Sequence, residues 1–378
     1  MRTFVEIARF EVRYQLRQPL FYVCLAIFSL LTFGAVASDQ VTLGDAIGNV
    51  NRNAPFVIMQ SLLVMSILGF FPATAFLAGS IHRDVEHDSE SIFFSAPITR
   101  FQYLGGRFAG TFLVSLGVFV GVILAIIIGS WMPWLEPERI GPFRLAPYLF
   151  SFFVLVLPNL LVAGAILFSV AALTRSMLAT YASLVALCVG YAVAAAFIGN
   201  LENERIASLV DPFAISAFTV STRFWTVYEK NSQLLTLDGP FLYNRLLWLG
   251  LAATVLSATY ARFRMQLSQP SRKAGRRRAL ALAAEHQPLA VGGPLPAPAQ
   301  TFDAAGSFRQ YLHATRVELG STLKSLPFLV IFALGILNVI GGSKPVEQLF
   351  GTPVFPVTHL MVRVIEGSFL LFALIVGT

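Results

Sequence analysis

The chain has 378 residues, of which 56% are hydrophobic and only 12% are charged, and it has a formal net charge of +7 and a mean hydropathy of +0.71. Soluble domains contain about 25% charged residues, so this composition excludes a soluble globular protein and indicates a chain surrounded largely by lipid. No segment resembles a folded basic domain. We therefore interpret the positive charge as contact with anionic lipid headgroups and not with nucleic acid.

Residues 1–18 are predicted to form an amphipathic helix on the cytoplasmic surface of the membrane. Arg9, Arg13 and Arg17 share one side of this helix, and Glu11 lies in the same stretch. Most of the remaining surface is apolar, which is typical of an interfacial helix whose apolar side enters the bilayer. The apolar positions are Phe4, Ile7, Phe10, Val12, Tyr14 and Leu16.

Six apolar runs follow, and each is long enough for a spanning helix, which needs roughly 20 residues. They predict an all-α, multi-pass membrane protein with a six-span unit at residues 19–264. Arg and Lys are concentrated in the segments on the same side as the N-terminus, so we expect the N-terminus in the cytoplasm. Cys24 and Cys188 lie inside apolar runs and are interpreted as packing residues. The expected spans are residues 19–38, 54–81, 108–130, 146–173, 178–199 and 241–260.

Residues 82–107 form the longest cytoplasmic connection predicted within this unit. The stretch begins with acidic residues and histidines and continues with aromatic residues, and Thr99 is a plausible helix cap. The histidine spacing matches no zinc motif. Two interpretations remain, a solvated connector or a surface that docks a protein partner. The candidate docking residues are Asp84, Glu86, Asp88, Phe93, Phe94, Pro97, Thr99, Arg100 and Phe101.

Residues 200–240 are predicted to form a long outer loop. The loop is too polar to span the membrane, yet part of it is apolar enough to dip into the outer leaflet. Asp211 followed by Pro212 suits a turn or a helix cap. Trp225 and Tyr228 suit the aromatic belt at a membrane interface, and we favour an anchoring role for them over a contact with substrate.

The N-terminal pattern occurs a second time after a Pro- and Ala-rich stretch. Residues 265–306 are predicted to be a flexible cytoplasmic linker, and residues 307–378 to be the start of a second, similar unit with two spans. The last apolar run is still continuing at Thr378, so we expect a longer chain. A simpler interpretation is that any first span in this orientation follows basic residues, but this does not explain the shared glutamate. The aligned residues are Arg9 with Arg316, Glu11 with Glu318, and Arg17 with Lys324.

This plan resembles that of the ABC-2 type exporter permeases. The stretch from Asp84 to Gly106, with "FSAPITRFQYLGGR" at its centre, looks like the cytoplasmic loop that docks the ATPase subunit in that family. The segments "DPFAISAFTVSTRFWTVYEKN" and "NRLLWLGL" resemble bacterial permeases that carry two such halves in one chain. Many of those carry a C-terminal zinc aminopeptidase-like domain, which would lie beyond Thr378.

The resemblance implies a partner and a location. The partner would be an ABC ATPase subunit, and the location would be the bacterial cytoplasmic (inner) membrane. Short outer helices close the outer side of the pathway in the similar permeases. An outer gate would therefore involve Asp211, Pro212, Phe213 and Trp225.

Sequence motifs argue against chemistry within the chain itself. It has no P-loop motif, no H-E-x-x-H motif and no recognisable Ser/His/Asp arrangement, so we expect no catalytic, cofactor or metal site, and ATP only through a partner subunit. The favoured function is the permease subunit of an ABC exporter. The alternatives are an ion-coupled secondary transporter and a membrane anchor for a C-terminal peptidase. Ion coupling usually needs ionisable residues at membrane depth. The six spans offer only Arg245, near the outer end of the sixth, and the last apolar run offers Arg363 and Glu366.

Overall fold

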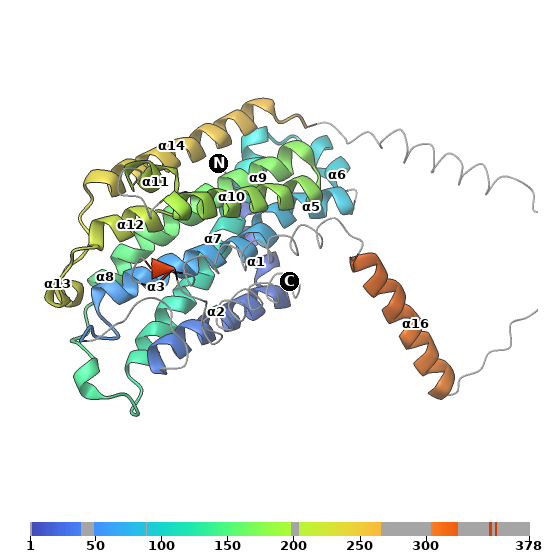
Figure 1. Ribbon diagram of the computed structural model, residues 1–378. Helices are drawn as coiled ribbons and strands as arrows, with labels where there is room; N and C mark the ends of the chain where they lie inside the picture. The colour runs from blue at the N-terminus through green and yellow to red at the C-terminus, as the bar shows by residue number, and fades with distance from the viewer. Residues whose placement is uncertain are drawn as a thin grey trace, which may run out of the picture. The chain divides into compact units, whose positions relative to one another are not determined.

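The computed structural model describes residues 2–38, 49–87, 89–197, 204–265, 304–323, 348–349 and 352–353. The chain divides into two compact units, residues 1–264 with 330–378, and residues 265–329. The described residues are almost entirely helical, as predicted (Figure 1). The exception is a short antiparallel pair of strands, β1 (Gln348–Leu349) and β2 (Thr352–Pro353), in which Gln348 is opposite Pro353.

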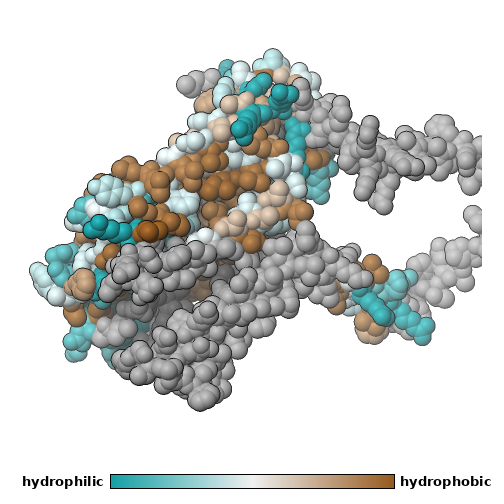
Figure 2. All heavy atoms as spheres, turned by 45° about the horizontal axis from the view of Figure 1, so that its top comes forward, coloured by the Kyte–Doolittle hydropathy of each residue, from teal (hydrophilic) through white to brown (hydrophobic). Residues whose placement is uncertain are grey.

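Four helical segments of the described chain are long and apolar enough to cross a membrane, and there are five if a bent pair counts as one span. In Figure 2, hydrophobic side chains cover the middle of the bundle and hydrophilic ones gather towards its ends. The remaining predicted span, the fifth, corresponds to α10 (Met177–Phe197), whose described apolar part is shorter. The four are α2 (Pro19–Ala37), α7 (Arg100–Ser130), the run of α8 (Ala146–Phe150), η3 (Ser151–Val156) and α9 (Leu157–Thr174), and α14 (Gly239–Arg262).

The bent pair consists of α3 (Pro55–Leu68) and the run Phe70–Glu86, which meet at an angle of 43°. Pro72 has no N–H to donate and a π-helical turn, η1 (Thr74–Ala78), follows it, and both are recognised causes of a helix kink. At Gly69 a Cβ atom would lie only 2.6 Å from Cζ of Phe119 in α7. The bend is therefore fixed by packing as well as by proline. The run Phe70–Glu86 comprises α4 (Phe70–Ala73), η1 and α5 (Gly79–Glu86).

The short helices and loops gather at the two ends of the bundle. One end carries α6 (Glu90–Ser95), the α9–α10 turn and the end of α14; the other carries η2 (Pro137–Arg139), α11 (Glu204–Val210), α12 (Ile215–Thr222) and α13 (Val227–Ser232). At the α13 end, loops bond to each other: Trp134 Nε1 donates to the Ala37 carbonyl at 2.8 Å and Asn53 Nδ2 donates to the Gly141 carbonyl at 2.7 Å.

Helix α13 begins with a capping box. The Thr226 hydroxyl accepts from the backbone N–H of Glu229, and the Glu229 carboxylate accepts from the backbone N–H of Thr226 at 2.7 Å. Hydrogen bonds from the Thr226 backbone and hydroxyl lower the pKa of Glu229, because they favour its charged form. The cap therefore keeps its acceptor ionised and fixes the start of α13.

Helix α1 (Arg2–Gln15) packs against the bundle on one side. The side that carries Ile7, Ala8 and Glu11 lies on α7, whereas Phe10 and Leu16 remain exposed. Arg9, Arg13 and Arg17 are exposed as expected. The contact is possible because α7 presents Gly106 and Gly110, the small residues of a G-x-x-x-G pattern that lets helix backbones approach closely. A Cβ atom at Gly110 would lie 2.5 Å from the Ala8 carbonyl oxygen and 2.7 Å from Cβ of Glu11.

Replacement of Gly110 by alanine is expected to lower the thermal stability of the purified, detergent-solubilised chain by several degrees, because the new methyl group meets the α1 backbone. Gly250→Ala is the matched control. Gly250 also lies inside a spanning helix, but a Cβ atom there would meet nothing within 4 Å. Alanine gains helix propensity of about 1 kcal/mol over glycine, so the control should be neutral or stabilising. Equal melting temperatures for the two variants would contradict the close α1–α7 contact.

Candidate functional site

A buried cluster of charges joins α1, α5 and α7. We call it the Glu11–Arg107 cluster; it comprises Glu11, Arg83, Asp84, Tyr103 and Arg107. Glu11 Oε1 accepts from Arg83 Nη2 at 2.7 Å and also pairs with Arg107 Nη1. Arg107 Nη2 lies 2.6 Å from Asp84 Oδ2, and the Tyr103 hydroxyl donates to the same oxygen at 2.7 Å.

The charges of the Glu11–Arg107 cluster are balanced and almost fully removed from solvent. The side chains of Glu11 and Arg107 are 0% and 1% exposed, and that of Asp84 is 3% exposed. Two carboxylates face two guanidinium groups, so each buried charge has an opposite partner. Loss of one partner from such a buried pair typically costs about 3–5 kcal/mol, because the other charge is left uncompensated. The cluster therefore resists separation of α1 from α5 and α7.

Aromatic side chains cover the cluster and correct the prediction for two docking residues. Phe93 and Phe94 on α6 were expected to be exposed anchors for a partner, but both are half-buried and face the bundle. The Arg107 guanidinium lies 4.8 Å from the ring centroid of Phe93. The Phe94 ring lies 5.7 Å from the Tyr103 ring, which also stacks on Phe263 at 5.9 Å. Short helix α6 is thus held to α7 and to the end of α14.

The turn between α9 and α10 holds the other side of α6. Arg175 adopts the left-handed conformation, with φ of 51°, and ends α9. Its Nη1 atom bonds to Glu90 Oε2 at 3.0 Å, and Nη2 lies 3.4 Å from the Arg264 carbonyl oxygen. This turn therefore connects α6 to the segment after α14. Glu90 is a buried structural partner within the chain.

The remaining predicted docking residues have different environments. Asp84 is buried in the Glu11–Arg107 cluster and is not available to a partner, which corrects that expectation. Thr99 is confirmed as a helix cap, because it forms a capping box with Gln102 at the start of α7. Phe101 is 57% exposed and stacks on Phe4, with 5.6 Å between ring centroids, and nearby Ile92 is 71% exposed. Glu86, Pro97 and Arg100 are exposed, and Asp88 lies outside the described residues.

A second buried polar cluster lies around the turn between α11 and α12. We call it the Asn159–Arg245 cluster; it comprises Ser66, Asn159, Asp211, Asn244 and Arg245. The carboxylate of Asp211 accepts from the backbone N–H groups of Phe213 and Ser216 at 2.8 and 2.6 Å. This confirms that Asp211 forms a turn and caps a helix.

Side-chain amides connect this turn to the long helices. Asn244 Nδ2 donates to the carbonyls of Ser208 and Asp211 at 2.6 and 2.7 Å. Asn159 Nδ2 donates to the Phe213 carbonyl at 3.1 Å and to Ser66 Oγ at 2.7 Å. Arg245 donates from Nη1 to Asn159 Oδ1 at 2.7 Å and from Nη2 to Asn244 Oδ1 at 2.8 Å.

The predicted outer-gate residues differ in burial. Asp211 and Phe213 are fully buried, and Phe213 lies 4.3 Å from Phe70 in ring-centroid distance. Trp225 is partly buried and lies 6.4 Å from Phe56, whereas Tyr228 is exposed. Pro212 is buried in the turn itself. Within the described parts of the chain, no group of three or more His, Cys, Asp or Glu residues could hold a metal ion.

Several members of both clusters were missed by reasoning from the sequence. Arg107 lies inside the G-x-x-x-G segment of Gly106–Gly110, and this pattern marks a close helix contact next to a charge. Asn159 is the lone amide in an otherwise apolar run, which marks a residue that needs a partner at membrane depth. Both signals are present in the local sequence and could have identified these two residues. The other missed members are Arg83, Tyr103, Ser66 and Asn244, and the separate ion pair of Glu90 with Arg175 was missed as well.

The chain also matches a known protein family. A model of the family described as "ABC-2 family transporter protein" matches residues 5–344.

The chain belongs to the ABC-2 transporter family.

The match confirms the resemblance and identifies the chain as an ABC-2 transporter membrane component, of a kind that is not itself an enzyme. It extends past the bundle through residues 265–306 and into the region predicted to begin a second unit. A search of curated proteins found no match. The candidate functional residues of this permease are those of the two buried polar clusters described above.

Neutralising Glu11 is expected to destabilise the permease by several kcal/mol, because Arg107 and Arg83 would lose their shared carboxylate in a buried site. The matched control is Glu6→Gln on the same helix. Glu6 pairs with Arg2 at 3.1 Å, but these side chains are 62% and 94% exposed, and exposed pairs contribute about 0–1 kcal/mol. Denaturant unfolding of Glu11→Gln and Glu6→Gln in detergent measures the difference. A Glu11→Gln variant as stable as Glu6→Gln would show that the cluster is not a stabilising contact.

Proposed function

We propose that the chain is the permease subunit of an ABC exporter that is powered by a separate ATPase docking on the α6 end of the bundle. The observation that supports this most is the Glu11–Arg107 cluster. A partner can move spanning helices only through a stiff contact, and the cluster joins the α5–α7 connection to α1 by buried ion pairs. A push on α6 would therefore move several helices together.

The proposed docking surface consists of Ile92, Phe101 and Met177, with Glu86 at its rim. These apolar side chains are exposed on α6, on the first turn of α7 and on the first turn of α10. The ion pair between Glu90 and Arg175 holds α6 beside the α9–α10 turn. Exposed apolar side chains next to charges suit a protein partner better than water. ATP would bind to that partner and not to this chain.

The proposed topology places the α6 end in the cytoplasm of a bacterium and the α13 end outside. The six-span unit would include α10 as its fifth span. The exposed arginines of α1, Arg9, Arg13 and Arg17, would then face lipid phosphates of the inner leaflet. Helix α16 (Ala304–Leu323), which carries Arg316 and Glu318, would be the counterpart of α1 in a second half. Lys324, Arg363 and Glu366 lie outside the described residues.

The outer gate is proposed to lie around the α11–α12 turn, with Asp211, Pro212 and Phe213 at its centre and Trp225 at its edge. Phe213 packs against Phe70 at the bend of the second span. Movement of that bend would therefore displace the α11–α12 turn directly. Apolar residues surround both. A cargo with substantial apolar surface suits these apolar surroundings. When the turn is in its closed position, it would separate the cargo from the outside.

The docking proposal predicts that the side chain at position 92 contacts an ATPase subunit. A photo-crosslinking amino acid in place of Ile92 should form a covalent adduct with a P-loop ATPase in native membranes, because this side chain is exposed on α6. The matched control replaces Phe224, which is 88% exposed in the segment between α12 and α13, and should give no ATPase adduct. Peptide mass spectrometry identifies the adduct. An ATPase adduct from both positions, or from neither, would contradict docking at α6.

The topology predicts opposite labelling of two exposed positions. In a chain with Cys24 and Cys188 replaced by alanine, Tyr228→Cys should react with a membrane-impermeant maleimide in intact cells. Ile92→Cys should react only after the cells are opened. Both side chains are more than two-thirds exposed, at 77% and 71%, so accessibility within the protein does not limit the reaction. Labelling of Ile92→Cys in intact cells would show that the proposed orientation is wrong.

A further inference from the structure

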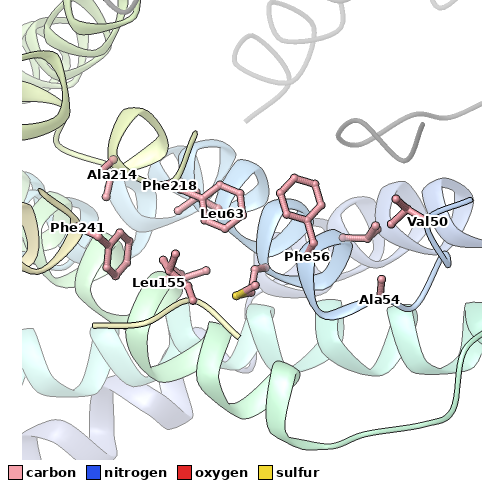
Figure 3. Close-up of a cluster of buried hydrophobic side chains, with 12 residues drawn as sticks. Val50, Ala54, Phe56, Leu63, Leu155, Ala214, Phe218 and Phe241 are labelled. Carbon is pink, nitrogen blue, oxygen red and sulfur yellow. The ribbon is translucent and has the colours of Figure 1, made fainter. Parts of the chain in front are cut away.

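The turn between α11 and α12 reaches far into the bundle. We call residues Ser208–Ser216 the inserted turn. The Phe213 carbonyl bonds to Asn159, which lies near the middle of the 29-residue run Ala146–Thr174. Figure 3 shows Ala214 and Phe218 of this region beside Leu63 of α3, Leu155 of η3 and Phe241 of α14. The inserted turn therefore occupies space between spanning helices.

A backbone turn in apolar surroundings needs donors for its carbonyls, because no water supplies them there. Amides and an indole of the long helices provide these donors. Asn244 bonds to three carbonyls, Asn159 bonds to one, and Trp248 Nε1 donates to the Leu209 carbonyl at 3.0 Å. All of these donors are neutral. Satisfying these carbonyls of the inserted turn thus requires no cation, and the N–H groups of Phe213 and Ser216 bond to the Asp211 carboxylate.

Arg245 is nevertheless buried in the same place and is only 5% exposed. Its three hydrogen bonds go to side-chain oxygens and not to the turn: one to Asn159 Oδ1, and two to Asn244 Oδ1 at 2.8 and 3.2 Å. An amide whose oxygen faces Arg245 must direct its NH₂ group away from it. In both residues that direction is towards a carbonyl of the inserted turn.

We propose that Arg245 is a positioning residue that orients Asn159 and Asn244 to hold the inserted turn between α3, α9 and α14, and that the turn leaves this position to open the outer side of the pathway. A buried guanidinium is costly at membrane depth, and such residues commonly have a functional role. The inference deepens the outer gate of the proposed function and rests on it. Both amides share one cation, so they release the turn together.

The test measures exposure of the inserted turn. Ser216 is 0% exposed, and Ser216→Cys is close in size. In a chain with Cys24→Ala and Cys188→Ala, we expect this thiol to react slowly with a membrane-impermeant maleimide added to the outside of spheroplasts without added ATP. Arg245→Met and Asn159→Leu should each raise the labelling rate at least about tenfold, because a lost hydrogen bond to a charged group shifts the open population by that order.

A double-mutant cycle separates positioning from general loss of structure. If Arg245 acts through Asn159, the Arg245→Met/Asn159→Leu chain should label no faster than the faster single variant, since coupled residues are not additive. Thr32→Ala is the matched control. Thr32 is also buried in a span, but its hydroxyl bonds only to carbonyls of its own helix, Phe28 and Ser29, so labelling of Ser216→Cys should not change.

Three results would overturn the inference. They are wild-type labelling rates in both single variants, additive effects in the double variant, and an equal rise with Thr32→Ala. Tyr228→Cys, labelled in each background, reports whether the chain is inserted. If the Arg245→Met chain is not inserted into the membrane, Asn159→Leu and Arg245→Lys provide the test. Labelling of Ser216→Cys at the wild-type rate in both of these variants would reject the proposal. Lysine keeps the charge but lacks the fork that reaches both amides, so an intermediate rate is expected.

A separate arm tests the proposed function. Adding ATP to the inner side of native membrane vesicles should accelerate labelling of Ser216→Cys in the otherwise unchanged chain. No acceleration, with faster labelling in Arg245→Met, would contradict ATP-driven opening and leave the positioning role intact. Acceleration by ATP with no effect of Arg245→Met would support ATP-driven opening and reject the positioning role of Arg245.

Discussion

The closeness of α1 to α7 is the constraint on which the α6 end depends. Gly106 and Gly110 remove the side chains that would separate the two backbones, and Glu11 then reaches Arg107 in a site that excludes water. Asp84 and Arg83 of α5 complete the charge balance, and the Tyr103 hydroxyl of α7 donates to Asp84. Aromatic residues of α6 pack over the same arginine. A helix that looks like a surface attachment is therefore part of the core of this end.

The two polar clusters use different partners, and this gives the ends different mechanical properties. At the α6 end, guanidinium groups face carboxylates, and separating such buried pairs exposes uncompensated charge. At the inserted turn, Arg245 bonds to neutral amides, and these bonds are individually weaker, about 1.5–3 kcal/mol each. The first arrangement suits transmission of force through a fixed body. The second suits a contact that opens and closes during transport.

The sequence predicted the class of fold, the positions of most long helices and the caps at Thr99 and Asp211, because these depend on local hydrophobicity and hydrogen bonding. It did not predict the burial of Asp84 or the inward position of Phe93. Both depend on which helices meet, and composition within one segment does not encode that. The sequence also did not predict that one side of α1, with Ile7 and Glu11, packs on α7, although Phe10 of the same helix and Leu16 just after it remain exposed. Only the paired glycines of α7 pointed to this contact.

The Glu11–Arg107 pair has a consequence for biosynthesis. Its partners are 96 positions apart, and α2 and the bent second span are made between them. At about 5–20 residues per second, the ribosome needs roughly 5–20 s to produce Arg107 after Glu11. During that interval the glutamate lacks its fully buried partner Arg107, and water is expected to solvate α1. The three exposed arginines on its outer side would hold it at the anionic membrane surface until the third span is inserted. The same helix would thus be a surface element first and a packed element later.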